Sequence, residues 1–252
     1  MIDPLADARY SVQHSKRHLD SFAAEWQTFV DSGCCSHAVE FSPPATDVHK
    51  IKLTESLPLS LASFAFDAVN NLRLALDQAG FAIATSRPGN KGKDAHFPFG
   101  VSFVEIQNRR TRRSKDLPPE IFDLMVSFQP YEGGNDLLLA VNKICNSHKH
   151  QMITPAAMVP TSAVTRSLMR LPGTVVHTPF VLDSVSNEIR LLSVPHRTQP
   201  NAHFQIDISV TFSNIASLNG QPLFGVVNKM ASMIDSILVA LEAEARRIGL
   251  FT

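Results

Sequence analysis

The sequence predicts an α+β fold with helices packed on one face of an antiparallel sheet, and three observations lead to this prediction. Long segments in the first half and at the C-terminal end repeat apolar residues at three- and four-residue steps, as amphipathic helices do. Segments 37–41 and 48–54 read as an N-terminal hairpin. Segment 163–212 reads as a C-terminal strand meander, so both strand groups can form the same sheet.

The chain of 252 residues is expected to form a single α+β domain, 1–252. Its helical, motif-bearing part would be 1–155, and the strand meander with the terminal helix would be 156–252. With 44% hydrophobic residues it can bury a substantial core. Lys and Arg balance Asp and Glu at 23 each, which argues against a globally basic nucleic-acid binder and is consistent with a homo-oligomer.

Four helices are expected in chain order. The first follows Asp3-Pro4, where a cap residue precedes proline, and ends at Gly33. A second covers 59–85. A third begins after the cap residue Asn135 and continues to about 151. The last covers 222–248. Residues 96–134 are expected to be mostly loop, with a short helix starting near 118.

Four strands are expected after residue 155, at 163–170, 174–182, 188–194 and 203–212. The last one alternates strictly, with Phe204, Ile206 and Ile208 on one side and polar residues on the other. This period of two indicates an antiparallel strand with one buried face.

Cysteine usage and the N-terminus predict a cytoplasmic protein. Cys34, Cys35 and Cys145 form no C-x-x-C pair and no disulfide framework. The N-terminus lacks the basic and apolar regions of a signal peptide, and no long uncharged apolar run is present, so no membrane contact is expected. Common nucleotide-binding and hydrolase signatures are absent as well, and no cofactor is expected.

The first candidate site lies at the end of the third helix. Asn142, Asn146 and His150 recur at i, i+4 and i+8 and so form one polar stripe, with Lys149 beside it and His148 on the other side. Imidazoles with a pKa near neutrality can act as acid or base, and the ammonium can stabilise an anion. The competing interpretation is a helix end whose cations favour the C-terminal turn.

The second candidate is the pair Arg73 and Asp77 on the second helix, at i and i+4. If this helix faces the third one, both side chains would meet Asn146 and His150 in a polar two-helix node. The competing interpretation is an intrahelical ion pair worth about 0.2–0.5 kcal/mol.

The third candidate is a basic block with five cations in seven residues: Arg109, Arg110, Arg112, Arg113 and Lys115. Arginine forks suit phosphates, so this loop is a candidate contact for RNA. The competing interpretation is a solvated, mobile loop. His14 and His18, one helical turn apart, have no matching third ligand, so no metal site is predicted.

An ordered set of short motifs resembles a widespread family of uncharacterised bacterial proteins. The set comprises 3–9 (DPLADAR), 71–78 (NLRLALDQ), 97–99 (FPF), 129–131 (QPY) and 146–150 (NSHKH). The resemblance implies a shared fold without an assigned activity. The second segment is also similar to the arginine–histidine signature of HEPN-type ribonucleases, in which the two residues cut RNA across a dimer interface. Here Gln78 stands where that histidine would be, and an amide cannot shuttle a proton.

Two functions follow as hypotheses. In the first, Arg73, Asp77, Asn146, Lys149 and His150 organise a ligand pocket or a dimer interface in a protein without catalytic activity. In the second, a HEPN-like enzyme of a defence or toxin system cleaves RNA, with Arg73 and either His148 or His150 as its reactive groups and the basic block as its RNA contact.

Overall fold

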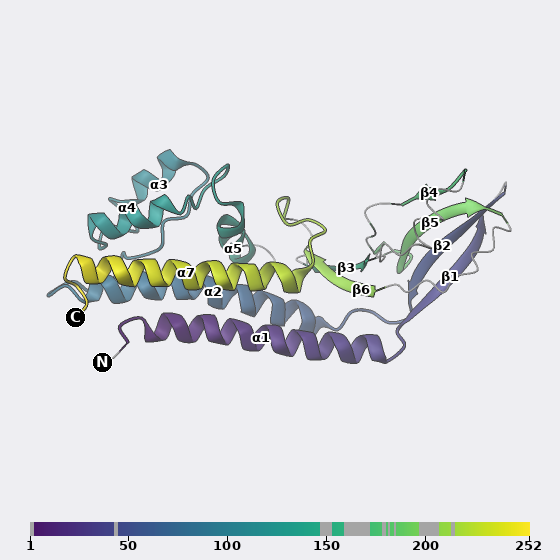
Figure 1. The fold of residues 1–252 in the computed structure, drawn as a ribbon, viewed down its shortest axis with the longest axis horizontal. Coiled ribbons are helices and arrows are strands. Elements are labelled where there is room, and N and C mark those ends of the chain that lie inside the picture. Colours follow the sequence, from purple (N-terminus) through teal and green to yellow (C-terminus); the bar gives the residue numbers. More distant parts are fainter. Residues whose placement is uncertain are drawn as a thin grey trace. The chain divides into compact units, whose positions relative to one another are not determined.

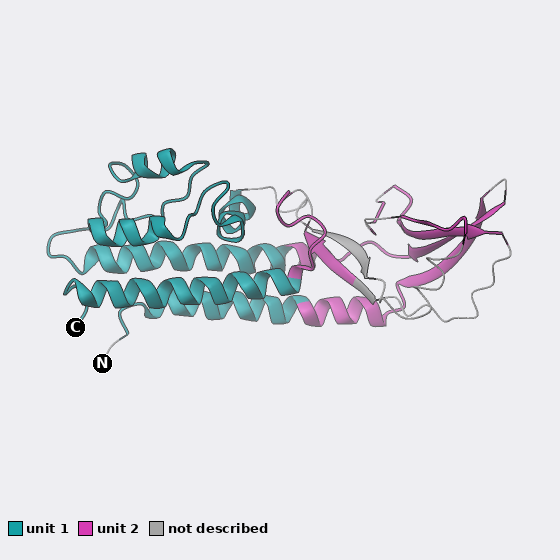
Figure 2. Ribbon diagram, turned by 45° about the horizontal axis from the view of Figure 1, so that its top comes forward, with its two compact units in different colours: residues 1–22, 63–149, 224–252 teal, residues 23–62, 150–223 magenta. Residues whose placement is uncertain are grey.

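A computed structural model describes residues 3–42, 45–146, 153–158, 172–177, 180, 182–183, 185–196, 207–212 and 215–252. The α+β fold class is confirmed, with helices and an antiparallel sheet (Figure 1). The chain divides into two compact units (Figure 2): residues 1–22, 63–149 and 224–252 form unit 1, and residues 23–62 and 150–223 form unit 2. The single domain stays a prediction.

Unit 1 is helical. The first part of α1 (Ala6–Asp31), most of α2 (Leu59–Thr85) and most of α7 (Leu223–Arg247) lie side by side in it (Figure 1). The Ser11 hydroxyl on α1 donates to Gln78 Oε1 on α2 at 2.7 Å. Lys16 pairs with Asp235 on α7 at 3.1 Å. Three helices predicted from apolar periodicity therefore contact one another in this unit.

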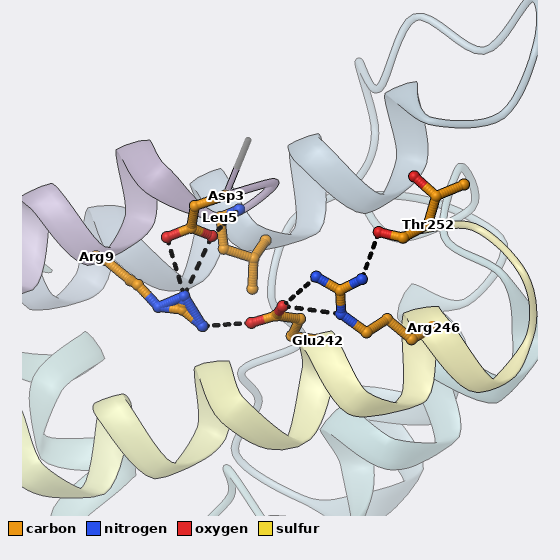
Figure 3. Close-up of polar contacts among 6 residues, drawn as sticks. All are labelled: Asp3, Leu5, Arg9, Glu242, Arg246 and Thr252. Carbon is orange, nitrogen blue, oxygen red and sulfur yellow. Dashed lines mark hydrogen bonds and ion pairs between the residues drawn. The ribbon is translucent and has the colours of Figure 1, made fainter. Parts of the chain in front are cut away.

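A polar chain joins the start of α1 to the end of α7 (Figure 3). The Arg9 guanidinium lies between the Asp3 carboxylate and Glu242. Glu242 also accepts from Arg246 at 2.8 Å, and Arg246 donates to the backbone carbonyl oxygen of Thr252. Glu242 thus faces two guanidinium groups, so its negative charge is compensated although its side chain is only 20% exposed.

Helix α7 is, by length and composition, the one helix among the described residues that is apolar enough to cross a membrane. Its apolar residues, such as Met230, Ile234 and Leu241, are buried within the protein. Its other side carries Asp235, which pairs with Lys16. A core helix of a helical bundle has these properties too.

Helix α2 is the central element of unit 1, because its apolar residues are buried on most sides, including Leu72, Leu76 and Ile83. A Cβ atom at Gly80 would lie 2.2 Å from the carbonyl oxygen of Ala95. Glycine is therefore required here for the close approach of segment 94–97 to α2. That segment leads into α3 (Phe103–Arg109) and, after several turns, α4 (Pro119–Ser127).

Helix α5 (Asp136–Asn146) completes unit 1. The Asn135 side chain accepts the backbone N–H of Leu138 at 3.0 Å, so the predicted cap is confirmed. The side-chain amide of Asn135 also lies 3.5 Å from Met233 Sδ on α7.

Unit 2 contains a four-stranded antiparallel sheet in the order β1-β2-β5-β4. The strands are β1 (Cys35–Ser42), β2 (Thr46–Leu53), β5 (Glu188–Pro195) and β4 (Val175–Val176). The N-terminal hairpin and later strands therefore share one sheet, as predicted. Trp26 and Phe29 of α1 pack with Ile51, Ile189 and Leu191 in its hydrophobic core.

Three features differ from the sequence-based expectations. Helix α3 occupies part of the expected loop, with Ser102 accepting the Glu105 N–H at its start. Strand β6 (Asp207–Phe212) pairs antiparallel with β3 (Ile153–Met158) in a separate two-stranded sheet, and β3 was not expected. Helix α3 has seven residues and strand β3 has six, and segments this short give weak periodic signals in the sequence. The predicted strand 163–170 lies outside the described residues.

Candidate functional site

The predicted pair Arg73 and Asp77 forms a close ion pair on α2. Arg73 Nη1 lies 2.5 Å from Asp77 Oδ2, although Nη1 lacks the geometry of a hydrogen bond to any described residue. The two side chains are 19% and 27% exposed, respectively. Partial burial strengthens the attraction relative to a fully solvated pair, so this contact is more than a surface ion pair.

Arg73 also reaches across to α5 and to segment 97–99. Its Nε donates to Asn142 Oδ1 at 3.3 Å. Its guanidinium carbon lies 4.6 Å from the centre of the Phe99 ring, which is a cation–π contact. The arginine is thereby held between two helices and an aromatic side chain.

Asp77 contacts the first residue of segment 97–99. Its Oδ1 accepts the backbone N–H of Phe97 at 2.9 Å and lies 3.8 Å from His96 Nδ1. We name Arg73, Asp77, Phe97, Phe99 and Asn142 the Arg73–Asp77 node. Phe97 and Phe99 are buried, so the node fixes a loop by ionic, aromatic and apolar contacts together.

One further motif of the resemblance, 129–131, lies near the node. The Gly100 N–H donates to the carbonyl oxygen of Pro130 at 3.2 Å. Gln129, at a φ of 58°, accepts the N–H groups of Tyr131 and Asn135 with its carbonyl oxygen, each at 2.8 Å. Motif segments 71–78, 97–99 and 129–131 therefore meet in the three-dimensional structure, and their contacts to one another are structural.

The sequence predicted that α5 would contribute Asn146 to this node, and the contact is made by Asn142 instead. Asn146 is the last residue of α5 and is exposed. Asn142 and Asn146 lie one turn apart on the same side of α5, so sequence periodicity does not show which of them contacts Arg73. His148, Lys149 and His150 lie outside the described residues, so their proposed roles stay predictions.

Cys145 lies beside the node, with its Sγ 3.9 Å from the Val69 carbonyl oxygen. Burial raises the pKa of this thiol to about 11; Asp77 raises it further and Arg73 opposes the shift. The thiol is consequently protonated at neutral pH and is a poor nucleophile.

Gln78, at the position where the HEPN signature has histidine, is held by α1. Its Oε1 accepts the Ser11 hydroxyl at 2.7 Å. The glutamine therefore connects two helices. The imidazole of His96 lies 3.8 Å from Asp77, the residue before Gln78 in the sequence, and is 49% exposed. Sequence reasoning missed His96 as a site residue, and its only signal was its place directly before the Phe97-Pro98-Phe99 motif.

Two hollows are lined in part by residues of α2. One of about 330 Å³ is lined by Leu74, Asp77, Gln78, Phe81, Gly92, Lys93, Ala95 and His96. We name it the α2 groove. Another of about 440 Å³ is lined by residues of α1, α2 and the C-terminal end, including Asp7, Gln78, Phe81, Thr85 and Phe251. Gln78 and Phe81 line both hollows.

The basic block at 109–115 is partly neutralised by ion pairs. Arg109 pairs with Glu105 at 2.8 Å, Arg110 with Asp123 at 3.1 Å and Lys115 with Asp94 at 2.9 Å. Arg112 and Arg113 form no ion pair with any described residue. Both line a third hollow, of about 430 Å³, together with Glu105, Asn108 and Arg109.

His14 and His18 lie one turn apart on α1, with their ring centres 4.7 Å apart. Burial lowers the pKa of His18, and His14 lowers it further, whereas Asp67 raises it. Among the residues that the structure describes, no group of three or more histidine, cysteine or acidic side chains is arranged to hold a metal ion.

No family model, no curated protein and no solved structure matches this chain.

Proposed function

We propose that this protein binds a small ligand in the α2 groove and is not a catalyst. One observation carries the proposal. Asp77 both lines the groove and anchors the backbone of Phe97, the residue next to the groove-lining His96. The Arg73–Asp77 node thus supports the wall of a hollow, and supporting contacts of this kind preorganise a binding site.

The size and lining of the groove support a small amphipathic ligand. Its volume of about 330 Å³ falls within the range of small-molecule pockets. Leu74 and Phe81 offer apolar contacts and are 45% and 53% exposed. Asp77, Lys93 and His96 offer a carboxylate, an ammonium and an imidazole within the same lining.

Ligand binding is tested by thermal denaturation of the purified protein against a panel of small polar metabolites. A ligand of the groove should raise the melting temperature of the wild type but not of Lys93→Ala. Lys91→Ala is the matched control, because Lys91 lies in the same loop but outside the lining. The proposal is wrong if no compound stabilises the protein, or if both lysine variants respond as the wild type does.

A second copy of the chain is the alternative occupant that the exposed apolar side chains of the groove can accept, so a homo-oligomer is the competing proposal for this groove. Light scattering after size-exclusion chromatography measures the molecular mass directly. A dimer that dissociates in Phe81→Ser would assign the groove to self-association, whereas an unchanged mass would leave it to a ligand.

RNA cleavage is the second candidate, and the 3.8 Å contact of His96 with Asp77 favours it because a carboxylate can orient an imidazole for proton transfer. The contacts of Arg73 with Asp77, Asn142 and Phe99 speak against it, since they hold the guanidinium in a structural role. Total RNA incubated with the wild type, His96→Ala and Arg73→Ala provides the test. Absent cleavage, or cleavage that both variants retain, excludes this activity.

A further inference from the structure

The hollow at the end of α3 is separate in its lining from the α2 groove. It measures about 430 Å³ and is lined by Glu105, Asn108, Arg109, Arg112 and Arg113. Three guanidinium groups and one carboxylate leave two uncompensated positive charges. We name this hollow the arginine pocket.

The single acidic residue of the pocket is fully engaged. Glu105 accepts the Val101 N–H at 2.7 Å and the Arg109 guanidinium at 2.8 Å. The Val101 N–H and Arg109 hold the pKa of this carboxyl below its usual value, so it stays ionised and paired with Arg109. Arg109 Nε is buried and has no hydrogen-bond partner among the described residues.

Backbone and side-chain hydrogen bonds hold the pocket in shape. The Arg112 and Ser114 N–H groups donate to the Arg109 carbonyl oxygen, each at 3.0 Å. The buried Ser114 hydroxyl donates to the His96 carbonyl oxygen at 2.8 Å, and His96 N–H donates to the Arg113 carbonyl oxygen at 3.0 Å. A framework formed before the ligand arrives lowers the entropy cost of binding.

We propose that the arginine pocket binds the phosphate group of a small phosphomonoester. A phosphomonoester has a charge of about −1.5 to −2 at neutral pH, which matches the two uncompensated arginines. Guanidinium groups bind phosphate oxygens through paired, charge-assisted hydrogen bonds. The Asn108 side chain adds an amide to the lining.

The same geometry disfavours an extended RNA strand at this site. Arg110 and Lys115 are paired with Asp123 and Asp94 and do not line the pocket, so the free cations are concentrated at one point. No aromatic side chain lines the pocket, so stacking with bases is not provided. A strand would need several phosphate contacts along its length.

The test is calorimetric titration of the full-length protein with ribose 5-phosphate and with inorganic phosphate at constant ionic strength. The wild type should bind both saturably, and Arg112→Gln/Arg113→Gln should lose affinity at least about tenfold, since two charge-assisted contacts are removed. Arg112→Lys, which keeps the charge without the fork, should give an intermediate loss. Binding of ribose 5-phosphate should strengthen as pH rises through about 6, where the phosphomonoester becomes a dianion.

The double variant Arg110→Gln/Lys115→Gln removes the same two charges from the same block but outside the pocket, and it should keep affinity within about twofold, as expected for cations already engaged in surface ion pairs. The proposal is overturned if the wild type binds neither phosphate probe, or if this control loses as much affinity as the pocket variant. Preferential binding of a 5′-hydroxyl oligouridylate, with equal losses in all variants, also overturns it in favour of an RNA surface. None of these outcomes bears on the lysine variants of the α2 groove, so the two proposals fail independently.

Discussion

Asp77 accepts the backbone N–H of Phe97 at 2.9 Å, so one carboxylate on α2 fixes a segment twenty residues further along the chain. The same carboxylate pairs with Arg73, which in turn contacts Phe99 and Asn142. Asp77 thus contacts segment 97–99 directly, and through Arg73 it connects α2 with α5. The contribution of this side chain to stability is the first prediction.

Replacing Asp77 by asparagine should lower the free energy of unfolding by about 2 kcal/mol, because the partly buried Arg73 guanidinium then loses its counter-charge. Urea denaturation followed by circular dichroism measures the change. Asp235→Asn is the control: it breaks an exposed pair with Lys16 and should cost less than about 0.5 kcal/mol. Equal losses in the two variants would contradict a special role for Asp77.

The two asparagines of α5 should differ in their effect on stability. Asn142→Ala removes the acceptor of Arg73 Nε and should cost about 1 kcal/mol. Asn146→Ala changes an exposed residue at the helix end and should cost less than about 0.5 kcal/mol. The same denaturation experiment compares them. A larger loss for Asn146 would place the polar contact one turn later than the structure does.

Alanine at position 80 should destabilise the protein, although alanine favours helices by about 1 kcal/mol over glycine. The new Cβ would lie 2.2 Å from the Ala95 carbonyl oxygen, and a backbone atom cannot rotate away. A net loss of about 1–3 kcal/mol is expected, with displacement of segment 94–97. Gly225→Ala is the matched control, because nothing lies within 4 Å of its added Cβ and helix propensity alone should act. A more stable Gly80→Ala variant would refute the close approach.

Stability should fall as pH decreases below 6.5, in part because of His37 and His49 of the β1–β2 hairpin. Their ring nitrogens Nε2 and Nδ1 are 3.1 Å apart. Burial lowers the pKa of both from the ordinary value of 6.5; His37 lowers that of His49 further, and Asp47 raises it. The unfolded chain therefore binds more protons in this window, and protonation favours unfolding.

Denaturation midpoints measured in steps from pH 7.5 to about 5, on either side of the ordinary histidine pKa, give the slope. The slope should be shallower in His49→Gln, which removes the buried imidazole of the pair. Gln13→Ala, which changes an exposed residue of α1 that does not titrate, is the control and should leave the slope unchanged. A wild type whose stability is constant over this range would contradict the prediction.

Local patterns predicted most of the helices because each has a continuous apolar face. The expected segment 59–85 coincides with α2 (Leu59–Thr85), and the cap at Asn135 is confirmed. Helix α3 was not predicted, because its seven residues are too few to show a helical repeat of apolar residues. The pairing of β6 with β3 was missed for another reason: strand partners are chosen by non-local contacts, and alternation shows only which face of a strand is buried.

For the candidate site too, the sequence identified residues, and the structure identified their contacts. The i, i+4 spacing identified the Arg73–Asp77 pair, and residue composition identified the basic block. Neither could reveal that Arg73 contacts Asn142, that His96 approaches Asp77, or that Arg110 and Lys115 are neutralised by Asp123 and Asp94. These partners are distant in sequence, and their side chains meet only after the helices have packed.

The sequence by itself determined the fold class, most of the helical segments and the residues able to carry charge or protons, because these properties depend on local composition and periodicity. Only the tertiary structure decided which of those residues are used up in structural contacts and which remain available. Arg73 is engaged on three sides, whereas Arg112 and Arg113 are unpaired within the described part of the chain. Whether a charge is paired depends on distances between segments far apart in the chain, and packing fixes those distances.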